Sequence, residues 1–362
     1  MMKPLETERL IIREYHESDL PEYHGLLSDK QNMYFLDDIT TNSLEESCES
    51  LKNAIHMNNS VKARRFCITL KERGNDKLIG GVGYEITAIT PLGKIADPMG
   101  WFIMPEFQNN GYVTEAARRV LDYAFSQDDC IRVVTGCYAD NLPTQKVMDK
   151  VGFRKEGERF EAQFHDGKMK DRLEYALNKD EWEIKKEIAH YKSLPCIFDG
   201  FIDLPELTDG VIHLVCTSKR AAIPEKKYVP AYDFAICKGS EKIGEIVLRI
   251  GYGGFGPDES SLYYGGQIGY AISEQHRGNG YAVRACRLLL PVAKAHGMIK
   301  LLITNNITNT ASRRVCENLG LRFVRTARLP EWTNLYKDGS RFNNIYEWSL
   351  EREHIPKLNR CV

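Results

Sequence analysis

The chain contains a long internal repeat, and a repeat constrains the fold more strongly than any local pattern. The segment GWFIMPEFQNNGYVTEAARRVLDYA at 100–124 returns as GYAISEQHRGNGYAVRACRLLLPVA at 269–293. Further along, NLPTQKVMDKVGF at 141–153 matches NTASRRVCENLGL at 309–321. Because these landmarks occur in the same order each time, we expect two copies of one domain.

A charged segment followed by two prolines marks the boundary between the copies. After Asn178, the stretch DEWEIKKEIAHYKSL has the composition of a charged helix and ends at Pro195, and Pro205 precedes the strand-like GVIHLVCT. The expected organisation is a first domain at 1–180, a linker at 181–207, a shorter second domain at 208–350 and a polar tail at 351–362.

Apolar periodicity predicts a mixed α/β fold with a central sheet in each copy. Apolar residues follow a helical stripe over 113–125 and again over 282–292, where Pro291 should bend the helix. Each copy then continues with a strand, a second helix and a hairpin that turns at Asp166-Gly167 or Asp338-Gly339. The first copy has room for two front helices near 20–27 and 44–57, whereas 217–233 in the second copy is too short for them.

The charge balance excludes partners that bind through broad electrostatic attraction. The chain has 49 Lys and Arg residues against 50 Asp and Glu residues, a formal net charge of -1. Nucleic acid and anionic lipid are therefore not expected partners, and an anionic ligand must be held by local geometry.

The remaining composition indicates a reduced cytoplasmic protein without a metal site. Charged residues at Glu6, Glu8 and Arg9 interrupt any secretory signal, and no apolar run is long enough for a membrane span. The 10 cysteines are scattered, so we expect free thiols rather than disulfides. The 9 histidines show no metal-ligand spacing.

Two glycine bends are the strongest candidates for a ligand site. Asn110-Gly111 and Asn279-Gly280 have the sequence of hairpin turns, but each is followed by a helical stripe rather than a strand. Such a bend exposes free backbone N–H groups at a helix N-terminus, which carries about half a positive charge. The pattern therefore predicts a receptor for a diphosphate.

These bends resemble a loop found in a known enzyme family. Gln108-x-x-Gly111-x-Val113 and Arg277-x-x-Gly280-x-Ala282 are similar to the acetyl-CoA loop, Q/R-x-x-G-x-G/A, of the GNAT N-acetyltransferases. Flanking segments, among them LETERLIIREYHESDL near the N-terminus, resemble the branch that acetylates ribosomal-protein N-termini. The resemblance spans 5–178 and, less completely, 210–350. It implies two tandem GNAT-like domains, each with a mostly antiparallel central sheet flanked by helices.

The resemblance also implies the residues that hold acetyl-CoA between two splayed strands. Ile103 and Ile272 would pair with the pantetheine amides, and Asn141 and Asn309 would contact the pantetheine arm, although either Asn is equally typical of a helix N-cap. Backbone amides of two segments would bind the pyrophosphate: Gln108, Asn109, Asn110, Gly111, Tyr112 and Val113 in the first copy, and Arg277, Gly278, Asn279, Gly280, Tyr281 and Ala282 in the second.

The catalytic groups are less well defined. Thr144 and Ser312 stand where this branch places a hydroxyl beside the thioester sulfur, and they are the candidate proton donors to the leaving thiolate, or else simple first-turn caps. Many GNAT enzymes use a Tyr acid at the positions that Met148 and Cys316 occupy here. The usual strand carboxylate is also missing, because Pro98 and Gln267 stand at its positions, so no general base is assigned.

The expected activity is transfer of an acetyl group to a primary amine by direct attack, with a strand N–H stabilising the oxyanion. An alkylamine with a pKa of about 10.4 needs about 4 kcal/mol to reach its neutral form near pH 7. The acceptor, a small-molecule amine or a peptide N-terminus, and the oligomeric state stay open. Two alternatives remain: one or both copies bind acetyl-CoA without turnover as a sensor or scaffold, or one copy packs as a purely structural partner.

Overall fold

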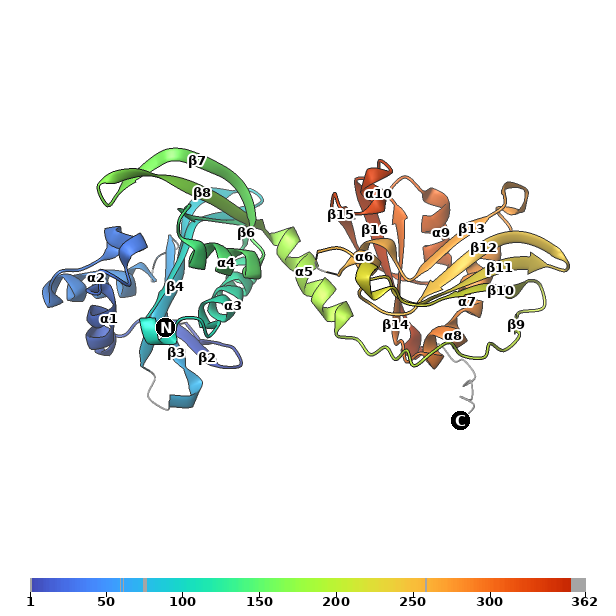
Figure 1. Cartoon of the computed structure of the whole chain (residues 1–362), viewed down its shortest axis with the longest axis horizontal. Helices are drawn as coiled ribbons and strands as arrows, with labels where there is room; N and C mark the ends of the chain where they lie inside the picture. The colour runs from blue at the N-terminus through green and yellow to red at the C-terminus, as the bar shows by residue number, and fades with distance from the viewer. Residues whose placement is uncertain (1, 59, 61, 74–76, 258, 353–362) are drawn as a thin grey trace. The chain divides into compact units, whose positions relative to one another are not determined.

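The computed structural model describes residues 2–58, 60, 62–73, 77–257 and 259–352. The chain divides into two compact units, 1–183 and 184–362 (Figure 1). This division falls within the predicted linker, 181–207, whose finer limits stay a prediction. Most of the predicted tail, 351–362, lies outside the described residues.

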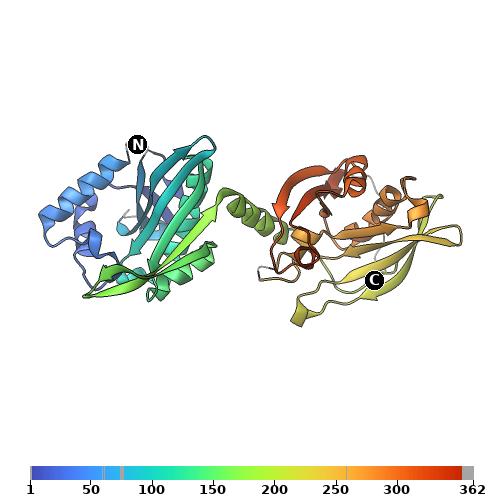
Figure 2. The ribbon, with the colours of Figure 1, turned by 90° about the horizontal axis from the view of Figure 1, so that it is seen from above.

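The first unit is built on one sheet of eight strands in the order β1-β2-β3-β4-β5-β6-β8-β7. All neighbouring strands are antiparallel except β5 and β6, which are parallel. Figure 2 shows this sheet after a quarter turn, with its strands side by side. The strands are β1 (Leu5–Glu6), β2 (Leu10–Glu14), β3 (Ala63–Leu70), β4 (Leu78–Thr90), β5 (Gly93–Ile103), β6 (Cys130–Tyr138), β7 (Arg154–His165) and β8 (Lys168–Asn178).

Helices cover both faces of this sheet (Figure 1). Strand alternation explains why: Phe66 and Ile68 pack in the core under α3, whereas Cys67 between them packs under α1 and α2. The helices are α1 (Leu20–Leu27), α2 (Leu44–Met57), α3 (Tyr112–Ser126) and α4 (Leu142–Val151), with short 3-10 turns η1 (Glu17–Asp19), η2 (Tyr34–Ile39), η3 (Lys71–Arg73) and η4 (Pro105–Phe107). The two predicted front helices are thus α1 and α2.

The second unit has two sheets where one was expected. A five-stranded sheet has the order β13-β12-β11-β10-β9, and a three-stranded sheet has the order β14-β16-β15. The strands are β9 (Leu207–Thr208), β10 (His213–Arg220), β11 (Ala231–Lys238), β12 (Glu241–Arg249), β13 (Ile268–Ile272), β14 (Lys300–Asn306), β15 (Arg322–Arg328) and β16 (Phe342–Ser349).

Gln267 joins the two sheets in place of a ladder between β13 and β14. Its backbone N–H donates to the carbonyl of Leu302 at 2.9 Å, and its side-chain carbonyl accepts from the Leu302 N–H at 2.6 Å. Gln267 occupies the position of the missing strand carboxylate, and here it has a structural role.

The helices of the second unit confirm one expectation and correct another. The predicted helix at 282–292 breaks at Pro291 into α7 (Tyr281–Leu288) and α8 (Leu290–Ala295), and the described segment between β10 and β11 contains only η5 (Pro224–Lys226). The two strands of the predicted final hairpin, β15 and β16, are antiparallel neighbours, but the predicted tight turn at 338–339 is wrong, because a long connection with α10 (Asn334–Lys337) joins them. The others are α5 (Lys179–Lys192), α6 (Ser261–Gly265), α9 (Thr310–Asn318), η6 (Glu274–His276) and η7 (Leu350–Arg352).

Two findings bear on the compositional expectations. Among the described residues, no helix is long and apolar enough to cross a membrane. The nine described cysteines are all free thiols, and burial raises the pKa of Cys137 and Cys196 to about 11.

Candidate functional site

The two glycine bends have the same backbone conformation. In the first unit, Asn109 and Gly111 have left-handed φ angles of 61° and 78°, and Gly111 caps α3. In the second unit, Gly278 and Gly280 have φ angles of 80° and 73°, and Gly280 caps α7. The bends lead into helices, so the hairpin alternative is excluded.

Each bend presents a run of backbone donors without partners. Gln108 N donates to Pro105 O at 3.1 Å, and the next amide with an acceptor is that of Glu115, which donates to Gly111 O at 3.0 Å. Within the part of the chain that the structure describes, the N–H groups of 109–114 have no acceptor. The second bend repeats the pattern over 278–283. A run of free amides at a helix N-terminus is an anion-binding arrangement.

Asparagine side chains hold both bends in shape. Asn110 Nδ2 donates to Gln108 O at 2.9 Å. Asn279 Nδ2 donates to His276 O at 3.1 Å and to Arg277 O at 3.2 Å. These bonds turn the asparagine side chains back onto the preceding carbonyls, so the amides after them face outward unpaired.

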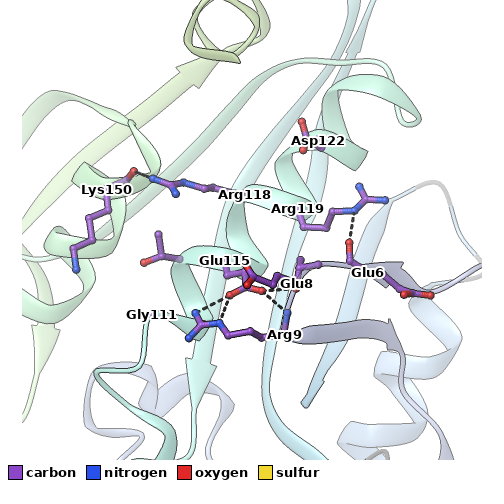
Figure 3. A pocket seen from close by; sticks show the side chains of 11 residues that line it. Glu6, Glu8, Arg9, Gly111, Glu115, Arg118, Arg119, Asp122 and Lys150 are labelled. Atoms are coloured by element: carbon purple, nitrogen blue, oxygen red, sulfur yellow. Dashed lines mark hydrogen bonds and ion pairs between the residues drawn. The ribbon is translucent and has the colours of Figure 1, made fainter. Parts of the chain in front are cut away.

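A groove of about 510 Å³ runs beside the first bend and the start of α3. Figure 3 shows Arg9 and Glu115 paired at its centre, with Arg118, Arg119 and Lys150 along its rim. The Arg9 guanidinium lies 2.7 Å from Glu115 Oε2 and donates through Nη1 to Asn110 O at 3.1 Å. A cationic side chain therefore lies against the bend itself.

The second unit reverses this ion pair. Arg284 occupies the helix position that corresponds to Glu115, and its Nη1 lies 2.7 Å from Asp209 Oδ2. Asp209 also accepts from the N–H groups of Val211 and Ile212, both at 3.0 Å. The helix of the second unit thus carries the cation, while the turn before β10 carries the acid.

The strands that lead to and from each bend separate, and we call the region between them the cleft of that unit; β13 and β14 lie in different sheets. In the first unit, β5 and β6 pair only through Lys94–Ala96 and then separate, and the Thr135 hydroxyl donates to Met99 O at 2.7 Å near the base of the cleft. At the far ends, Ile103 O accepts from Asn32 Nδ2 at 3.1 Å, and Ile272 O accepts from Arg277 Nε at 3.1 Å. A carbonyl oxygen has two lone pairs, so each keeps one acceptor position.

Asn141 and Asn309 are helix N-caps. Asn141 Oδ1 accepts from Thr144 N at 3.2 Å, and Asn309 Oδ1 accepts from Ser312 N at 3.0 Å. The side-chain NH₂ groups of both residues have no acceptor among the described residues. Capping therefore leaves each amide a donor for a ligand, and the predicted pantetheine contact stays a prediction.

The two candidate hydroxyls have different surroundings. Tyr270 Oη lies 3.0 Å from Ser312 Oγ, and burial raises the pKa of Tyr270, so the phenol stays protonated near neutral pH. In the first unit Trp101 takes the position of Tyr270, and the Thr144 hydroxyl has no partner among the described residues. Sequence reasoning missed Tyr270 because it searched for the phenol on the helix, where Met148 and Cys316 are buried in the core.

Comparison with known proteins identifies the family. The profile of the "Acetyltransferase (GNAT) domain" matches residues 9–154 and again 212–322. The chain belongs to the GNAT acetyltransferase family. The family resemblance, the tandem fold and the enzyme class that the sequence predicted are confirmed.

Relatives of this GNAT chain are single acetyltransferases that match about half of it. The uncharacterized N-acetyltransferase YnaD of Bacillus subtilis is 29% identical over 176 residues, which are 49% of this chain and 97% of the relative. The spermidine N(1)-acetyltransferase of Vibrio cholerae is 26% identical over 165 residues, 46% of this chain and 90% of the relative. The crystal structure of a GNAT acetyltransferase from Bacillus anthracis has 24% identity and a TM-score of 0.43, covering 49% of this chain and 100% of that one.

Proposed function

We propose that this enzyme uses acetyl-CoA to acetylate a primary amine. The observation that carries the proposal is the run of unpartnered N–H groups at 109–114, repeated at 278–283. Such runs fit a diphosphate in a protein of near-zero net charge, because main-chain donors replace the missing basic residues. Solved neighbours that contain coenzyme A or acetyl-CoA support the same cosubstrate.

Different groups around each bend would bind different parts of acetyl-CoA. The amides of 109–113 and 278–282 would hold the pyrophosphate, and the edges of β5 and β13 at Ile103 and Ile272 would pair with the pantetheine. The predicted contribution of the Gln108 and Arg277 amides is wrong, because these two N–H groups donate to Pro105 O and Glu274 O. The side-chain NH₂ groups of Asn141 and Asn309 would donate to the pantetheine carbonyls. Each of these groups is a backbone edge or a cap, so the fold itself positions them.

The reaction needs an acid near the sulfur. When bound, acetyl-CoA supplies an activated acyl carbon, which the neutral amine attacks as the C–S bond breaks and the amide C–N bond forms. In the second unit, Ser312 would give its proton to the departing thiolate and take one from Tyr270. The nitrogen would lose one proton to water as the amide forms, and water would return a proton to Tyr270. In the first unit, Thr144 is the corresponding donor, without a phenol behind it.

The names of two relatives indicate the chemical class of the acceptor. One relative is named for spermidine and another is a putative ribosomal N-acetyltransferase of Bacillus subtilis. Both names imply primary amines, in a polyamine or at a peptide N-terminus. We propose an acceptor of this kind for the present enzyme.

Two measurements test the function. Titration calorimetry with acetyl-CoA should show binding, and mass spectrometry should detect an added acetyl group on an amine from a panel of spermidine, aminoglycosides and short peptides. The absence of binding in both clefts would contradict the proposal.

A second candidate is that one unit binds acetyl-CoA without turnover. It is favoured by the Trp101 that replaces the Tyr270 phenol in the first unit. Binding without any acetylated product across the panel would support it.

A further inference from the structure

A cluster of aromatic and charged side chains lies in the first unit, away from the bend. We call Tyr34, Phe35, Tyr138 and His165 the aromatic cluster. It joins η2, the end of β6 and the β7–β8 hairpin: the His165 ring centroid is 4.6 Å from that of Tyr34 and 4.7 Å from that of Tyr138. These three elements are distant in sequence, so the cluster is a tertiary feature.

The cluster stands at the open end of the cleft between β5 and β6. Tyr138 is the last residue of β6. On the other side, Asn32, two residues before Tyr34, donates to Ile103 O at the end of β5, and its Oδ1 accepts from Gln108 Nε2 at 2.8 Å. The segment 32–39 therefore connects the end of β5, through Asn32, with the end of β6, through the ring contact of Phe35 with Tyr138.

His165 has a buried nitrogen without a partner. The residue is only 3% exposed, and its Nδ1 lies 3.2 Å from Asp37 Oδ2. Among the described residues its Nε2 has no hydrogen-bond partner. A carboxylate at Nδ1 holds the ring proton there, so the lone pair of the neutral imidazole is on Nε2. Unpartnered buried polar atoms are uncommon, and each calls for an explanation such as a ligand.

The charged groups around His165 favour a positive charge in the cluster. Lys170 Nζ lies 2.7 Å from Asp140 Oδ2, which raises the pKa of Lys170, and the Tyr34 hydroxyl donates to Asp166 Oδ2 at 3.0 Å. The charged and titratable groups around the cluster are Tyr34, Asp37 and Asp38 from η2, Tyr138 from β6 with Asp140 just after it, and Asp166, Lys168, Lys170 and Arg172 from the hairpin. The four carboxylates outnumber the three cations, which favours a bound ammonium.

We propose that His165 is the general base of the first unit and that its acceptor is a cationic amine. This inference rests on the proposed function and supplies the base that the motif positions lack. Nε2 takes one proton from the ammonium, and the neutral nitrogen attacks the acetyl carbon as the C–S bond breaks. Thr144 gives its proton to the thiolate and takes the second nitrogen proton, and the imidazolium releases its proton to solvent, so one proton leaves per turnover.

The experiment uses the full chain with spermidine and the other panel amines. Gly111→Val is measured first, and the activity that it removes is assigned to the first unit. His165→Gln and Asp37→Asn are then compared with His56→Gln, an exposed histidine of α2 in the same unit. Thermal unfolding and acetyl-CoA affinity are recorded for every variant.

We expect His165→Gln to lower kcat/KM of the first unit by about 100-fold or more near pH 7, with unchanged acetyl-CoA affinity. The loss should shrink as the pH approaches the pKa of the amine, about 10.4 for an alkylamine, because the amine then needs no base. Asp37→Asn should show a smaller loss of the same form, and His56→Gln should show none.

Three outcomes overturn the inference. If His165→Gln keeps the activity, or loses it equally at all pH values, His165 is not the base. If Gly111→Val removes no activity, turnover belongs to the second unit. If the wild-type chain acetylates no amine, the proposed function itself fails, which is distinct from an active enzyme that tolerates His165→Gln.

Discussion

Replacing Gly280 tests whether the bend binds the diphosphate through its backbone. Gly280 has a φ of 73°, a conformation that costs a residue with a side chain about 1–2 kcal/mol. A Cβ built at this position meets no atom within 4 Å, so Gly280→Val adds backbone strain without a steric clash inside the protein. The free energy of unfolding should therefore fall by no more than about 2 kcal/mol.

The effect on affinity should be larger and local. The added side chain stands among the amides of 278–283, where the phosphate oxygens have to approach. A hydrogen bond to a charged group is worth about 1.5–3 kcal/mol, so losing one contact should weaken acetyl-CoA binding about 10-fold or more. Titration calorimetry measures the affinity and the number of sites, because Gly280→Val should remove one cleft and spare the other.

The matched control is Gly239→Val in the same unit. Gly239 has a φ of 56° in the turn between β11 and β12, and a Cβ there also meets nothing within 4 Å. It carries the same kind of strain far from the bend. If Gly239→Val and Gly280→Val lower stability alike and both leave acetyl-CoA affinity unchanged, the bend does not hold the diphosphate.

Three further predictions concern side chains near the two clefts. Tyr270→Phe should lower the kcat of the second unit about 10-fold, with unchanged acetyl-CoA affinity, because the Ser312 hydroxyl loses its hydrogen-bond partner. Steady-state kinetics on a Gly111→Val background measure this kcat, and an equal kcat with and without Tyr270→Phe would contradict the prediction. Asn141→Asp should keep the N-cap and the thermal midpoint but weaken acetyl-CoA binding, whereas Asn141→Ala should also cost about 1 kcal/mol of stability; equal affinity in all three proteins would leave Asn141 a cap only. Burial acts to raise the pKa of Glu115, but bonds from Thr7 and Arg9 more than offset it and hold the pKa below its usual value. The bonds to the Glu115 carboxylate should therefore stabilise the folded protein by about 1 kcal/mol above about pH 4.3, and this contribution should be lost at lower pH. The difference in thermal midpoint between wild type and Glu115→Gln should then disappear on acidification.

The repeat and the bends could be predicted because local chemistry determines them. Gly111 and Gly280 are needed for left-handed turns, and the apolar stripes that follow require helices. The break at Pro291 follows in the same way from a missing N–H. These features depend on neighbours within a few positions, which a sequence shows directly.

The features that the sequence did not reveal depend on contacts between distant segments. Tyr270 on β13 contacts Ser312 on α9, and His165 contacts Asp37, 128 positions away in the sequence. The split of the second sheet depends on Gln267, whose side chain substitutes for part of a ladder. Periodicity contains no information about such pairings, so the proposed acid and base could be inferred only from the fold.

The two units have the same bend but different charged side chains beside it. This difference distinguishes the contribution of the bend from that of the neighbouring charges. The first bend has the Arg9 guanidinium on Asn110 O, whereas in the second unit the cation of the equivalent pair is Arg284 on the helix. If side-chain charge governed diphosphate binding, the two clefts would need the same pair in the same orientation. Since the free amides repeat and the charges do not, we propose that the main chain is the common determinant of diphosphate binding, and that the charges tune affinity and its salt dependence separately in each unit.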